Sequence, residues 1–372
     1  MLTRIYIDNF RCFVNFEYTP ESKQLLLGAN GTGKSSLLDA ITFLKQFAKG
    51  DKNPFISSSR TRWLDRPLQV FEIDTVLDKQ KYEYRVAVRF ARSTTSGDIA
   101  SSKLTISQEQ LKVSGKTVFE LSKGRIHFFQ NNGGQATTVP LEMTKSALHL
   151  SQLSNPHVRR FVEWLDSVHC FRIDVYPEAM EESTDREARE PDAELQNLAD
   201  WYRYLVQADP EANVRFLNSM QEVLPGFQTL RFSSDEDGNR RLRADFAGPR
   251  KQKLNFAISE LSDGQRYLLA LYMVLHFLIA RGSTVFIDEP DNFVALREIQ
   301  PWLLTAEEAA EEYGGQLILI SHHPEILNRW ASRQGLYFFR EENGQVRTKK
   351  FKLVSPGTLE PSELIARGWE NE

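Results

Sequence analysis

Hydrophobic and polar residues alternate along several stretches of the N-terminal third of the chain. The period of two at Leu2–Asp8 and Phe13–Tyr18 predicts strands, and the apolar run Gln24–Leu27 predicts a third strand. A helix is expected from Ser35 to about Ala48. Beyond it, alternation resumes and predicts an antiparallel β region, with strands at 71–77, 82–90, Lys103–Ser107, Glu109–Val113, Thr117–Leu121 and Arg125–Gln130.

A helical period follows this β region. Apolar side chains recur on one face of a helix predicted at Pro156–His169. The stretch Glu178–Glu194 is acidic and poor in aliphatic residues, so we expect a solvated or mobile loop there rather than a functional acidic arm. Two helices and a hairpin are expected next, at Asp192–Gln207, Glu211–Val223, and Gln228–Phe232 with Arg240–Phe246 across the turn Asp235–Asn239.

Helices alternate with apolar strands in the last third of the chain. The predicted order is helix Gln265–Ala280, strand Thr284–Asp288, helix Glu298–Glu312 and strand Gln316–Ile320. Such alternation predicts a parallel sheet. The fold class is therefore α/β, with a mixed or parallel sheet flanked by helices, an inserted antiparallel β region and a helical segment.

Composition and charge narrow the class of protein. Hydrophobic residues make up 41% and charged residues 26%, which is ordinary for a globular protein, and the net charge is -4. Any contact with nucleic acid must therefore come from a local basic patch. The two cysteines, Cys12 and Cys170, lack metal-ligand spacing and predict reduced thiols of a cytosolic protein. The longest apolar run, Tyr267–Ala280, is too short to span a membrane and predicts a buried helix.

A glycine-rich loop stands between the third strand and the first helix. The run from Gly28 to Ser35 reads Gly-Ala-Asn-Gly-Thr-Gly-Lys-Ser and fits the phosphate-loop pattern G-x-x-x-x-G-K-[ST]. Backbone N–H groups and the helix N-terminus of such a loop form an anion site. Lys34 supplies a positive charge to the β- and γ-phosphates, and the Ser35 hydroxyl ligates Mg²⁺. The residues predicted to bind nucleotide here are Asn30, Gly31, Thr32, Gly33, Lys34, Ser35 and Ser36.

Two carboxylates follow the buried strand Thr284–Asp288. Asp288 and Glu289 stand at its C-terminal end, which is where ligands sit in an open α/β sheet. We expect Asp288 to belong to the Mg²⁺ shell and Glu289 to polarise the attacking water as the catalytic base. An Asp-Glu pair alone would be weak evidence, but here it accompanies a phosphate loop.

The eight residues Ser259–Arg266 read Ser-Glu-Leu-Ser-Asp-Gly-Gln-Arg and open the helix Gln265–Ala280. They resemble the signature motif of ABC ATPases, usually Leu-Ser-Gly-Gly-Gln, with Asp263 in place of the first glycine. In that family the serine and the helix N-terminus meet the γ-phosphate of ATP bound to the opposite subunit. This resemblance implies nucleotide contacts from Ser262, Gly264 and Gln265. The alternative is that Ser262 or Asp263 is simply a helix N-cap.

The strand Leu317–Ile320 ends in Ser321-His322-His323-Pro324. A histidine at this place matches the switch histidine of ABC ATPases, which reaches the γ-phosphate. Alignment with the usual Thr-His-Ser-Pro selects His322 as catalytic and leaves His323 as its neighbour.

All four motifs stand in the order found in ABC ATPases. The opening Asn9-Phe10-Arg11-Cys12-Phe13 further resembles the N-terminus of the RecF, SMC and OLD-like ATPases rather than that of transporter ATPases. The resemblance covers about the first fifty residues and the span from about 255 to 330. In this group a glutamine senses Mg²⁺ and γ-phosphate, and Gln152 is the first candidate, with Gln130 second. Downstream of Glu289, Pro290–Leu296 departs from the usual Pro-Glu-Asn-x-Leu-His-Pro, so the dimer-contacting loop is altered.

The resemblance implies a single ABC-type ATPase head over residues 1–372. Its expected parts are a phosphate-loop part (1–50), the antiparallel β insertion (65–145), a helical segment (146–225), the part with the signature, carboxylates and histidine (226–340), and a C-terminal strand and tail (341–372). It also implies ATP and Mg²⁺ as cofactors and a homodimer that buries ATP at its interface.

Three functions remain open at this point. The first is a cytoplasmic ATPase that acts on DNA or on an associated effector, in DNA repair or anti-phage defence. The second is a transporter motor, which the N-terminal motif and the β insertion disfavour. The third is an ATP-gated scaffold that restrains a partner nuclease or toxin. OLD-like relatives carry a fused nuclease, but too few residues follow His322 for one, so we expect any nuclease to be a separate chain.

Duplex DNA is a further predicted partner, resting on local basic residues. They form clusters at Arg240, Arg241, Arg243, Arg250, Lys251 and Lys253, at Arg347, Lys349, Lys350 and Lys352, and at Arg159 and Arg160. Each cluster is more often a solvated face than a phosphate track, and the acidic turn Asp235–Asp237 lies beside the first one.

Overall fold

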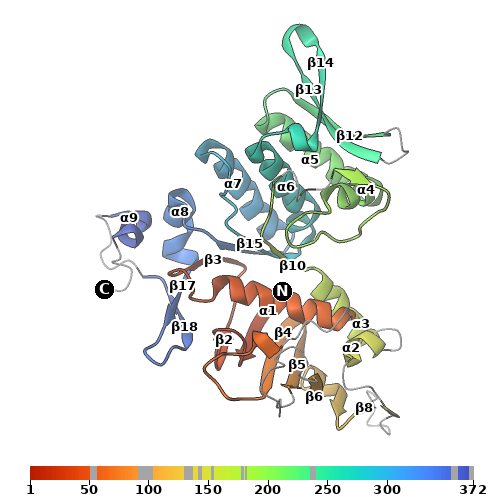
Figure 1. Ribbon diagram of the computed structural model, residues 1–372, viewed down its shortest axis with the longest axis vertical. Helices are drawn as coiled ribbons and strands as arrows, with labels where there is room; N and C mark the ends of the chain where they lie inside the picture. The colour runs from red at the N-terminus through yellow and green to blue at the C-terminus, as the bar shows by residue number, and fades with distance from the viewer. Residues whose placement is uncertain are drawn as a thin grey trace, which may run out of the picture. The chain divides into compact units, whose positions relative to one another are not determined.

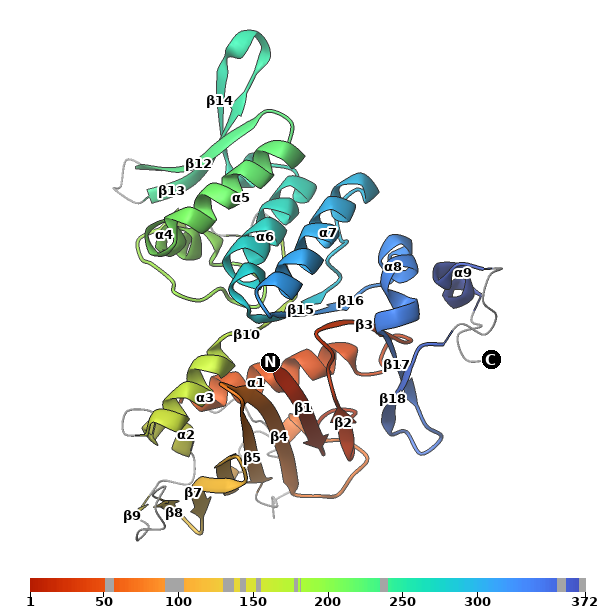
Figure 2. The ribbon, with the colours of Figure 1, turned by 180° about the vertical axis from the view of Figure 1, so that it is seen from behind.

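The computed structural model divides into two compact units. Unit 1 comprises Met1–Val168 and Arg333–Phe351, and unit 2 comprises His169–Ser332 and Lys352–Glu372. Figures 1 and 2 show the elements of both units from opposite sides. The structure describes residues 1–50, 57–90, 104–129, 137–140, 145–151, 155–176, 180, 182–234, 240–352 and 359–367.

An antiparallel sheet forms a large part of unit 1. Its strand order is β2-β1-β4-β5-β6-β7-β8-β9. Strand β1 pairs with β4, which places Ile5 opposite Ile73 and Ile7 opposite Phe71. The β region expected at 65–145 and the N-terminal strands therefore share one sheet. The strands are β1 Leu2–Asp8, β2 Phe16–Tyr18, β4 Leu68–Leu77, β5 Gln80–Phe90, β6 Leu104–Val113, β7 Lys116–Ser122, β8 Arg125–Phe128 and β9 Thr137–Pro140.

Two strand predictions in this sheet were wrong in detail. The second strand begins at Phe16 rather than Phe13, because Asn15 adopts a left-handed φ of 47° that ends an extended run. The described residues of the two strands predicted at Lys103–Ser107 and Glu109–Val113 belong to one strand, β6 (Leu104–Val113), and Lys103 lies outside the described residues. The pairing of β6 with β5 shifts between Ala87 and Val88, and this irregularity breaks the alternation in the sequence.

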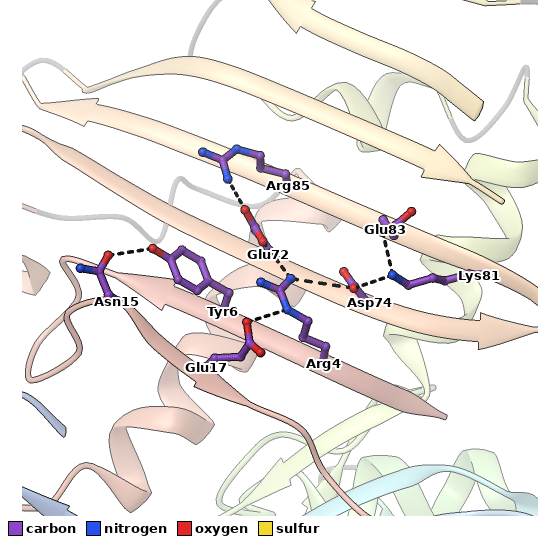
Figure 3. A network of polar contacts seen from close by, with 9 residues as sticks. All are labelled: Arg4, Tyr6, Asn15, Glu17, Glu72, Asp74, Lys81, Glu83 and Arg85. Carbon is purple, nitrogen blue, oxygen red and sulfur yellow. Dashed lines mark hydrogen bonds and ion pairs between the residues drawn. The ribbon is translucent and has the colours of Figure 1, made fainter. Parts of the chain in front are cut away.

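The two faces of the sheet differ in polarity. On the inner face Phe10 joins sheet and helix, because its ring lies 5.4 Å from that of Phe71 and 5.5 Å from that of Phe43 in α1. The outer face of β1, β4 and β5 carries a charged network (Figure 3). There Arg4 Nη1 donates to Glu72 Oε2 at 2.8 Å, and Lys81 Nζ lies 3.3 Å from Asp74. Pairs of this kind each contribute about 0.2–1 kcal/mol and favour this register.

The strand before the glycine-rich loop, β3 (Lys23–Leu27), is the first of three paired strands in unit 1. Strand β17 (Gly335–Arg340) runs parallel to β3, with Leu26 opposite Leu336, and β18 (Val346–Lys350) pairs antiparallel with β17. The helices are α1 (Lys34–Lys49), α2 (Ala147–Ser151) and α3 (Pro156–Asp166), with a short 3-10 helix at Ser57–Ser59. The C-terminal part of the chain thus returns to complete the sheet beside the loop.

Unit 2 contains the second parallel pair. Strands β15 (Thr284–Asp288) and β16 (Gln316–Ile320) run parallel, with Asp288 opposite Ile320, which confirms the predicted parallel pairing. Helix α6 (Asp263–Phe277) is buried from Arg266 to Phe277, as expected for a core helix. It is followed by a 3-10 turn at Ile279–Arg281. The other helices are α4 Leu198–Ala208, α5 Pro210–Val223, α7 Leu296–Glu312, α8 Pro324–Gln334 and α9 Pro361–Ala366.

A small antiparallel sheet completes unit 2. Its strands are β11 Ser183–Thr184, β12 Phe227–Ser234, β13 Arg240–Ala247 and β14 Lys253–Ala257. The unit begins at His169, within β10 (Val168–Phe171). In both views the β13–β14 hairpin extends away from α4, α5 and α6 (Figures 1 and 2). The predicted hairpin is present, and β14 adds a strand that the sequence pattern did not predict.

Most described residues of the acidic stretch 178–194 are irregular and exposed or half-buried, which confirms the expected solvated loop, and the short strand β11 is an exception within it. Ser183 and Thr184 pair with β13, and Arg186 Nε donates to Asp200 at 2.9 Å. The next helix begins at Leu198 instead of Asp192, because the Asp192 carboxylate accepts backbone N–H groups of a preceding turn. Local side-chain acceptors compete here with helix formation.

Glu109 ties α2 to the antiparallel sheet, although it is fully buried. Its carboxylate accepts hydrogen bonds from Tyr84 Oη at 2.9 Å, Ser146 Oγ at 2.6 Å, and the N–H groups of Ala147 and Leu148 at 2.8 and 3.4 Å. Burial raises the pKa of Glu109. The first turn of α2 is thus fastened to β6 by one side chain.

We predict that Glu109→Ala lowers the free energy of unfolding by about 3–5 kcal/mol, because it removes the buried acceptor of the Tyr84 and Ser146 hydroxyls and of the Ala147 N–H. Denaturant unfolding followed by tryptophan fluorescence measures the change. Glu83→Ala is the control, since its surface pair with Lys81 is worth less than about 1 kcal/mol. Equal stability of the two variants would contradict the anchoring role.

Candidate functional site

The glycine-rich loop in unit 1 requires its glycines. Gly28, Gly31 and Gly33 have φ values of 135°, 77° and 101°, which residues with a Cβ rarely adopt. A Cβ added at Gly28 would lie 2.3 Å from the carbonyl oxygen of Phe338 in β17. The backbone of the loop therefore passes directly against the neighbouring strand.

The N-terminal motif lies beneath this loop. A Cβ at Gly33 would lie 2.7 Å from Cys12 Sγ and 3.1 Å from the Phe13 ring. Asn9 is buried with a φ of 61°, and its Nδ2 donates to the carbonyls of Arg66 and Leu68 at 2.8 Å. Asn9 thereby holds the turn that presses Cys12 and Phe13 against Gly33.

The Lys34 side chain folds back into the loop. Its Nζ donates to the carbonyl of Gly28 at 2.6 Å and to that of Ala29 at 3.2 Å. Thr32 donates to the same Ala29 carbonyl through its N–H at 3.3 Å and its hydroxyl at 2.8 Å. Lys34 is buried, and its ammonium is bound by neutral carbonyls, so phosphate oxygens would be stronger acceptors for it. Of the other predicted loop residues, Asn30, Gly31 and Ser35 are exposed, Thr32 and Gly33 are buried and Ser36 is half-buried.

In unit 2 the carboxylates stand at the C-terminal end of β15. Glu289 is exposed and has a left-handed φ of 55°. Its N–H donates to the Ile320 carbonyl at 2.8 Å, its own carbonyl accepts from Tyr267 Oη at 2.6 Å, and its Oε2 accepts from Asn292 Nδ2 at 2.8 Å. Asp288 Oδ2 lies 3.5 Å from Arg172 Nε. The strained backbone of Glu289 is thus held from both sides.

Tyr267 is buried in α6 behind the two carboxylates. Burial raises the pKa of its phenol, and the negative charges of Asp291, Glu289 and Asp288 raise it further. The hydroxyl therefore remains a hydrogen-bond donor across the physiological pH range. The protonated hydroxyl therefore holds the Glu289 carbonyl in place by a hydrogen bond.

The signature segment caps α6. Ser262 Oγ accepts from the Gln265 N–H at 3.3 Å, and Gln265 Oε1 accepts from the Ser262 N–H at 3.0 Å, which is a capping box. Ser262 is exposed. A Cβ at Gly264 would lie 2.7 Å from the Phe293 carbonyl, so the loop after Glu289 packs against the helix start. The capping role considered for Ser262 is present, and it leaves the hydroxyl at the surface.

Arg266 organises this segment from inside. The guanidinium is 2% exposed and donates to the carbonyls of Val175 at 2.7 Å, Ser259 at 3.0 Å and Leu261 at 2.6 Å, and it also pairs with Asp263. Sequence reasoning gave Arg266 and Tyr267 no role. The position of Arg266, a charged residue at the start of an otherwise apolar helix, could have indicated its structural role.

The histidine segment follows β16. Ser321 Oγ donates to Asp291 at 2.5 Å and accepts from the His323 N–H at 2.9 Å, and His323 Nδ1 accepts from the Glu325 N–H at 3.3 Å. His323 therefore binds the start of α8, whereas His322 is exposed. This arrangement leaves His322 as the histidine predicted to be catalytic.

The predicted site residues fall into two groups, one in each unit. Unit 1 brings together the loop residues from Asn30 to Ser36. Unit 2 brings together Ser262, Gly264 and Gln265 at the start of α6, and Asp288, Glu289 and His322 at the ends of β15 and β16. Gln152 and Gln130 lie outside the described residues.

The donor set suits a Mg²⁺ ion that arrives with nucleotide. The described part of the chain holds no group of three or more histidine, cysteine or carboxylate side chains placed around an ion. Mg²⁺ in phosphate sites takes only one or two protein ligands and completes its octahedron with phosphate oxygens and water. The predicted Mg²⁺ ligands Ser35, in unit 1, and Asp288, in unit 2, each carry a hard oxygen atom of this kind, a hydroxyl and a carboxylate.

The basic residues at 240–253 are partly neutralised. Arg243 lies directly opposite Arg231 across β12 and β13. Arg231 Nε donates to Asp245 Oδ2 at 2.8 Å, and Arg243 Nη2 donates to the Asn255 carbonyl at 3.3 Å. The remaining described members of the cluster are exposed, namely Arg240, Arg241, Arg250 and Lys253, whereas the turn 235–239 lies outside the described residues.

Comparison with protein families decides the assignment. The family described as "AAA domain, putative AbiEii toxin, Type IV TA system" matches residues 25–328. The chain belongs to this family. The match confirms the predicted P-loop ATPase. The elements described above confirm the α/β fold class of this ATPase.

Two solved structures are similar to this ATPase. The SMC head domain from Thermotoga maritima is 13% identical with a TM-score of 0.46, covering 95% of this chain and 99% of that chain. The Smc head domain with an extended coiled coil bound to the C-terminal domain of ScpA, from Pyrococcus furiosus, is 12% identical with a TM-score of 0.49, covering 100% and 99%. No curated protein matches the chain. Among the described residues, no helix combines the length and apolar character needed to cross a membrane.

We predict that Tyr267→Phe lowers ATP turnover by this ATPase about tenfold, because loss of one buried hydrogen bond frees the strained Glu289 peptide. Affinity for ATP should stay within about twofold, since the phosphate loop is untouched. Steady-state phosphate release and equilibrium binding measure the two effects. Tyr272→Phe, the same change further along α6, is the control. Equal turnover of both variants would remove Tyr267 from this role.

Proposed function

We propose that this protein hydrolyses ATP with Mg²⁺ as an ABC-type homodimer, with Glu289 as the catalytic base. The observation that carries the proposal is the position of Glu289. It directly follows the buried strand β15, its backbone is held by Tyr267 and the Ile320 carbonyl, and its carboxylate is exposed. A carboxylate so fixed and open to solvent is suited to orient water and to accept its proton.

In the proposed reaction the two units contribute different groups, for phosphate binding and for proton transfer. The loop Asn30–Ser36 binds the β- and γ-phosphates, and Lys34 exchanges its carbonyl partners for their oxygens. Mg²⁺, when bound through Ser35 and Asp288, supplies charge neutralisation to the phosphates. Glu289 takes a proton from the attacking water, and His322 donates a hydrogen bond toward the γ-phosphate.

The proposed dimer rests on the signature segment. Ser262 is exposed and stands at the N-terminus of α6, where the helix dipole and free N–H groups favour an anion. In the ABC arrangement this anion is the γ-phosphate of ATP bound to a second copy of the chain. A two-fold dimer would then contain two such composite sites.

For the biological role we propose control of an effector in a toxin–antitoxin or anti-phage system. The family description, a putative AbiEii toxin of a type IV toxin–antitoxin system, supports this over DNA repair. ATP-driven closure of a cytoplasmic dimer would then switch a separately encoded nuclease or toxin. An ATP-gated scaffold that only restrains such a partner is the alternative, and a transporter motor is disfavoured.

Direct binding of duplex DNA stays a secondary prediction. The exposed arginines of β13 favour it, whereas the opposed pair Arg231 and Arg243 adds little, because Asp245 and Glu260 already lie within ion-pair distance of it. Asp245 and Asn255 already occupy part of that pair. Any DNA contact should therefore be weak and should fall steeply with salt.

We predict that Glu289→Gln retains ATP binding but slows hydrolysis about 100-fold or more, because the amide cannot accept the proton of water. Since closure would outlast hydrolysis, this variant should accumulate an ATP-dependent dimer, measurable by light scattering. Lys34→Ala, in contrast, should lose nucleotide affinity. Turnover of Glu289→Gln near that of the wild type would assign the base to another residue.

We predict that inactive Lys34→Ala and Ser262→Arg chains regain activity when mixed. One of the two composite sites in the mixed dimer then combines an intact loop with an intact signature segment, so turnover should approach about half that of the wild type per dimer. Differently tagged chains and co-purification verify that mixed dimers form. Mixed dimers without recovered turnover would mean that each site is completed within one chain.

A further inference from the structure

Arg340, at the end of β17, lies beside the phosphate loop without belonging to any of its motifs. Its Nη2 and Nε both donate to the Gly31 carbonyl, at 2.6 and 3.2 Å. Its Nη1 lies 3.4 Å from the carbonyl of Gly344 in the β17–β18 turn. The side chain is exposed, so packing does not account for its conformation. The guanidinium links the outermost part of the loop to the adjacent hairpin.

This contact determines how the peptide between Gly31 and Thr32 is turned. In a trans peptide the C=O and the following N–H point in opposite directions. Because Arg340 holds the Gly31 carbonyl on the outside, the Thr32 N–H points to the inside, where it donates to the Ala29 carbonyl at 3.3 Å. The same carbonyl accepts from Lys34 Nζ. The Thr32 N–H and the lysine ammonium therefore converge on the same carbonyl oxygen.

Gly31 cannot hold this orientation by itself. Its φ is 77°, it is exposed, and no atom lies within 4 Å of the place where a Cβ would be. A glycine so open to solvent can rotate its peptide at little steric cost. The two hydrogen bonds from Arg340 are the described contacts that restrain its carbonyl.

We propose that Arg340 is a positioning residue for the phosphate loop, which orients the Gly31–Thr32 peptide so that its N–H faces bound phosphate. The proposal rests on the proposed nucleotide-binding function of the loop. Arg340 acts through the backbone and contacts no reacting atom, so it should affect affinity for ATP and not the chemical step. The planar guanidinium supplies two donors to one carbonyl, which lysine cannot reproduce.

The test measures binding of a fluorescent ATP analogue with Mg²⁺ to the full chain in the Glu289→Gln background, together with KM and kcat in the otherwise unaltered chain. Arg340→Gln should raise Kd and KM about tenfold, equivalent to about 1.4 kcal/mol, while kcat changes less than about twofold. Arg340→Lys retains the charge and one donor, and should raise both values about threefold.

Arg347→Gln is the matched control. Arg347, on β18, likewise donates to backbone carbonyls, those of Val14 at 3.1 Å and Asn15 at 3.3 Å, but it does not contact the phosphate loop. Its Kd and KM should equal those of the unaltered chain. Kd for Arg340→Gln within twofold of the unaltered chain, or equal weakening by both glutamine variants, would overturn the proposal. A chain that binds the analogue but does not hydrolyse ATP would contradict the proposed hydrolysis and leave the binding comparison decisive for Arg340.

Discussion

The phosphate loop depends on a close approach of two backbones, that of Gly28 and that of Phe338 in β17. No side chain fits between them. The strand that makes this contact comes from the C-terminal part of the chain and pairs with β3. Arg340, at the end of the same strand, also binds the Gly31 carbonyl of the loop. Below the loop, the turn held by Asn9 presses Cys12 and Phe13 against Gly33. The loop is thus shaped from two sides by segments at opposite ends of the sequence.

In unit 2, polar loops lie at the C-terminal ends of the buried strands β15 and β16 and have to be held in place. They are held by polar side chains of one buried helix. Arg266 donates hydrogen bonds to the carbonyls of Ser259 and Leu261 in the signature segment, and Tyr267 donates one to the carbonyl of Glu289. Buried donors are costly unless they are paired, and here each is paired with a backbone acceptor that would otherwise be free to move. The proposed chemistry therefore depends on α6 as much as on the strands.

The assignment to a family described by a toxin of a type IV system gives this arrangement a biological context. Each of the two units carries one group of the predicted site residues. In the proposed role, a partner protein would respond to ATP-driven closure of the dimer.

The sequence by itself determined the elements and the chemistry that are encoded locally. The glycine-rich loop, the apolar strand before Asp288 and Glu289, and the helix after Ser262 each follow from a few consecutive residues, because turn geometry, strand burial and helix capping act over short distances. Strand limits at Phe16 and in β6 were missed, since left-handed residues and register shifts leave little trace in an alternating pattern. Only the tertiary structure decided that Glu109 anchors α2, that Arg266 and Tyr267 hold the motif loops, and that Arg340 reaches Gly31. These contacts join residues through space or through backbone carbonyls, and every residue carries a carbonyl, so no sequence pattern can mark which one is bound.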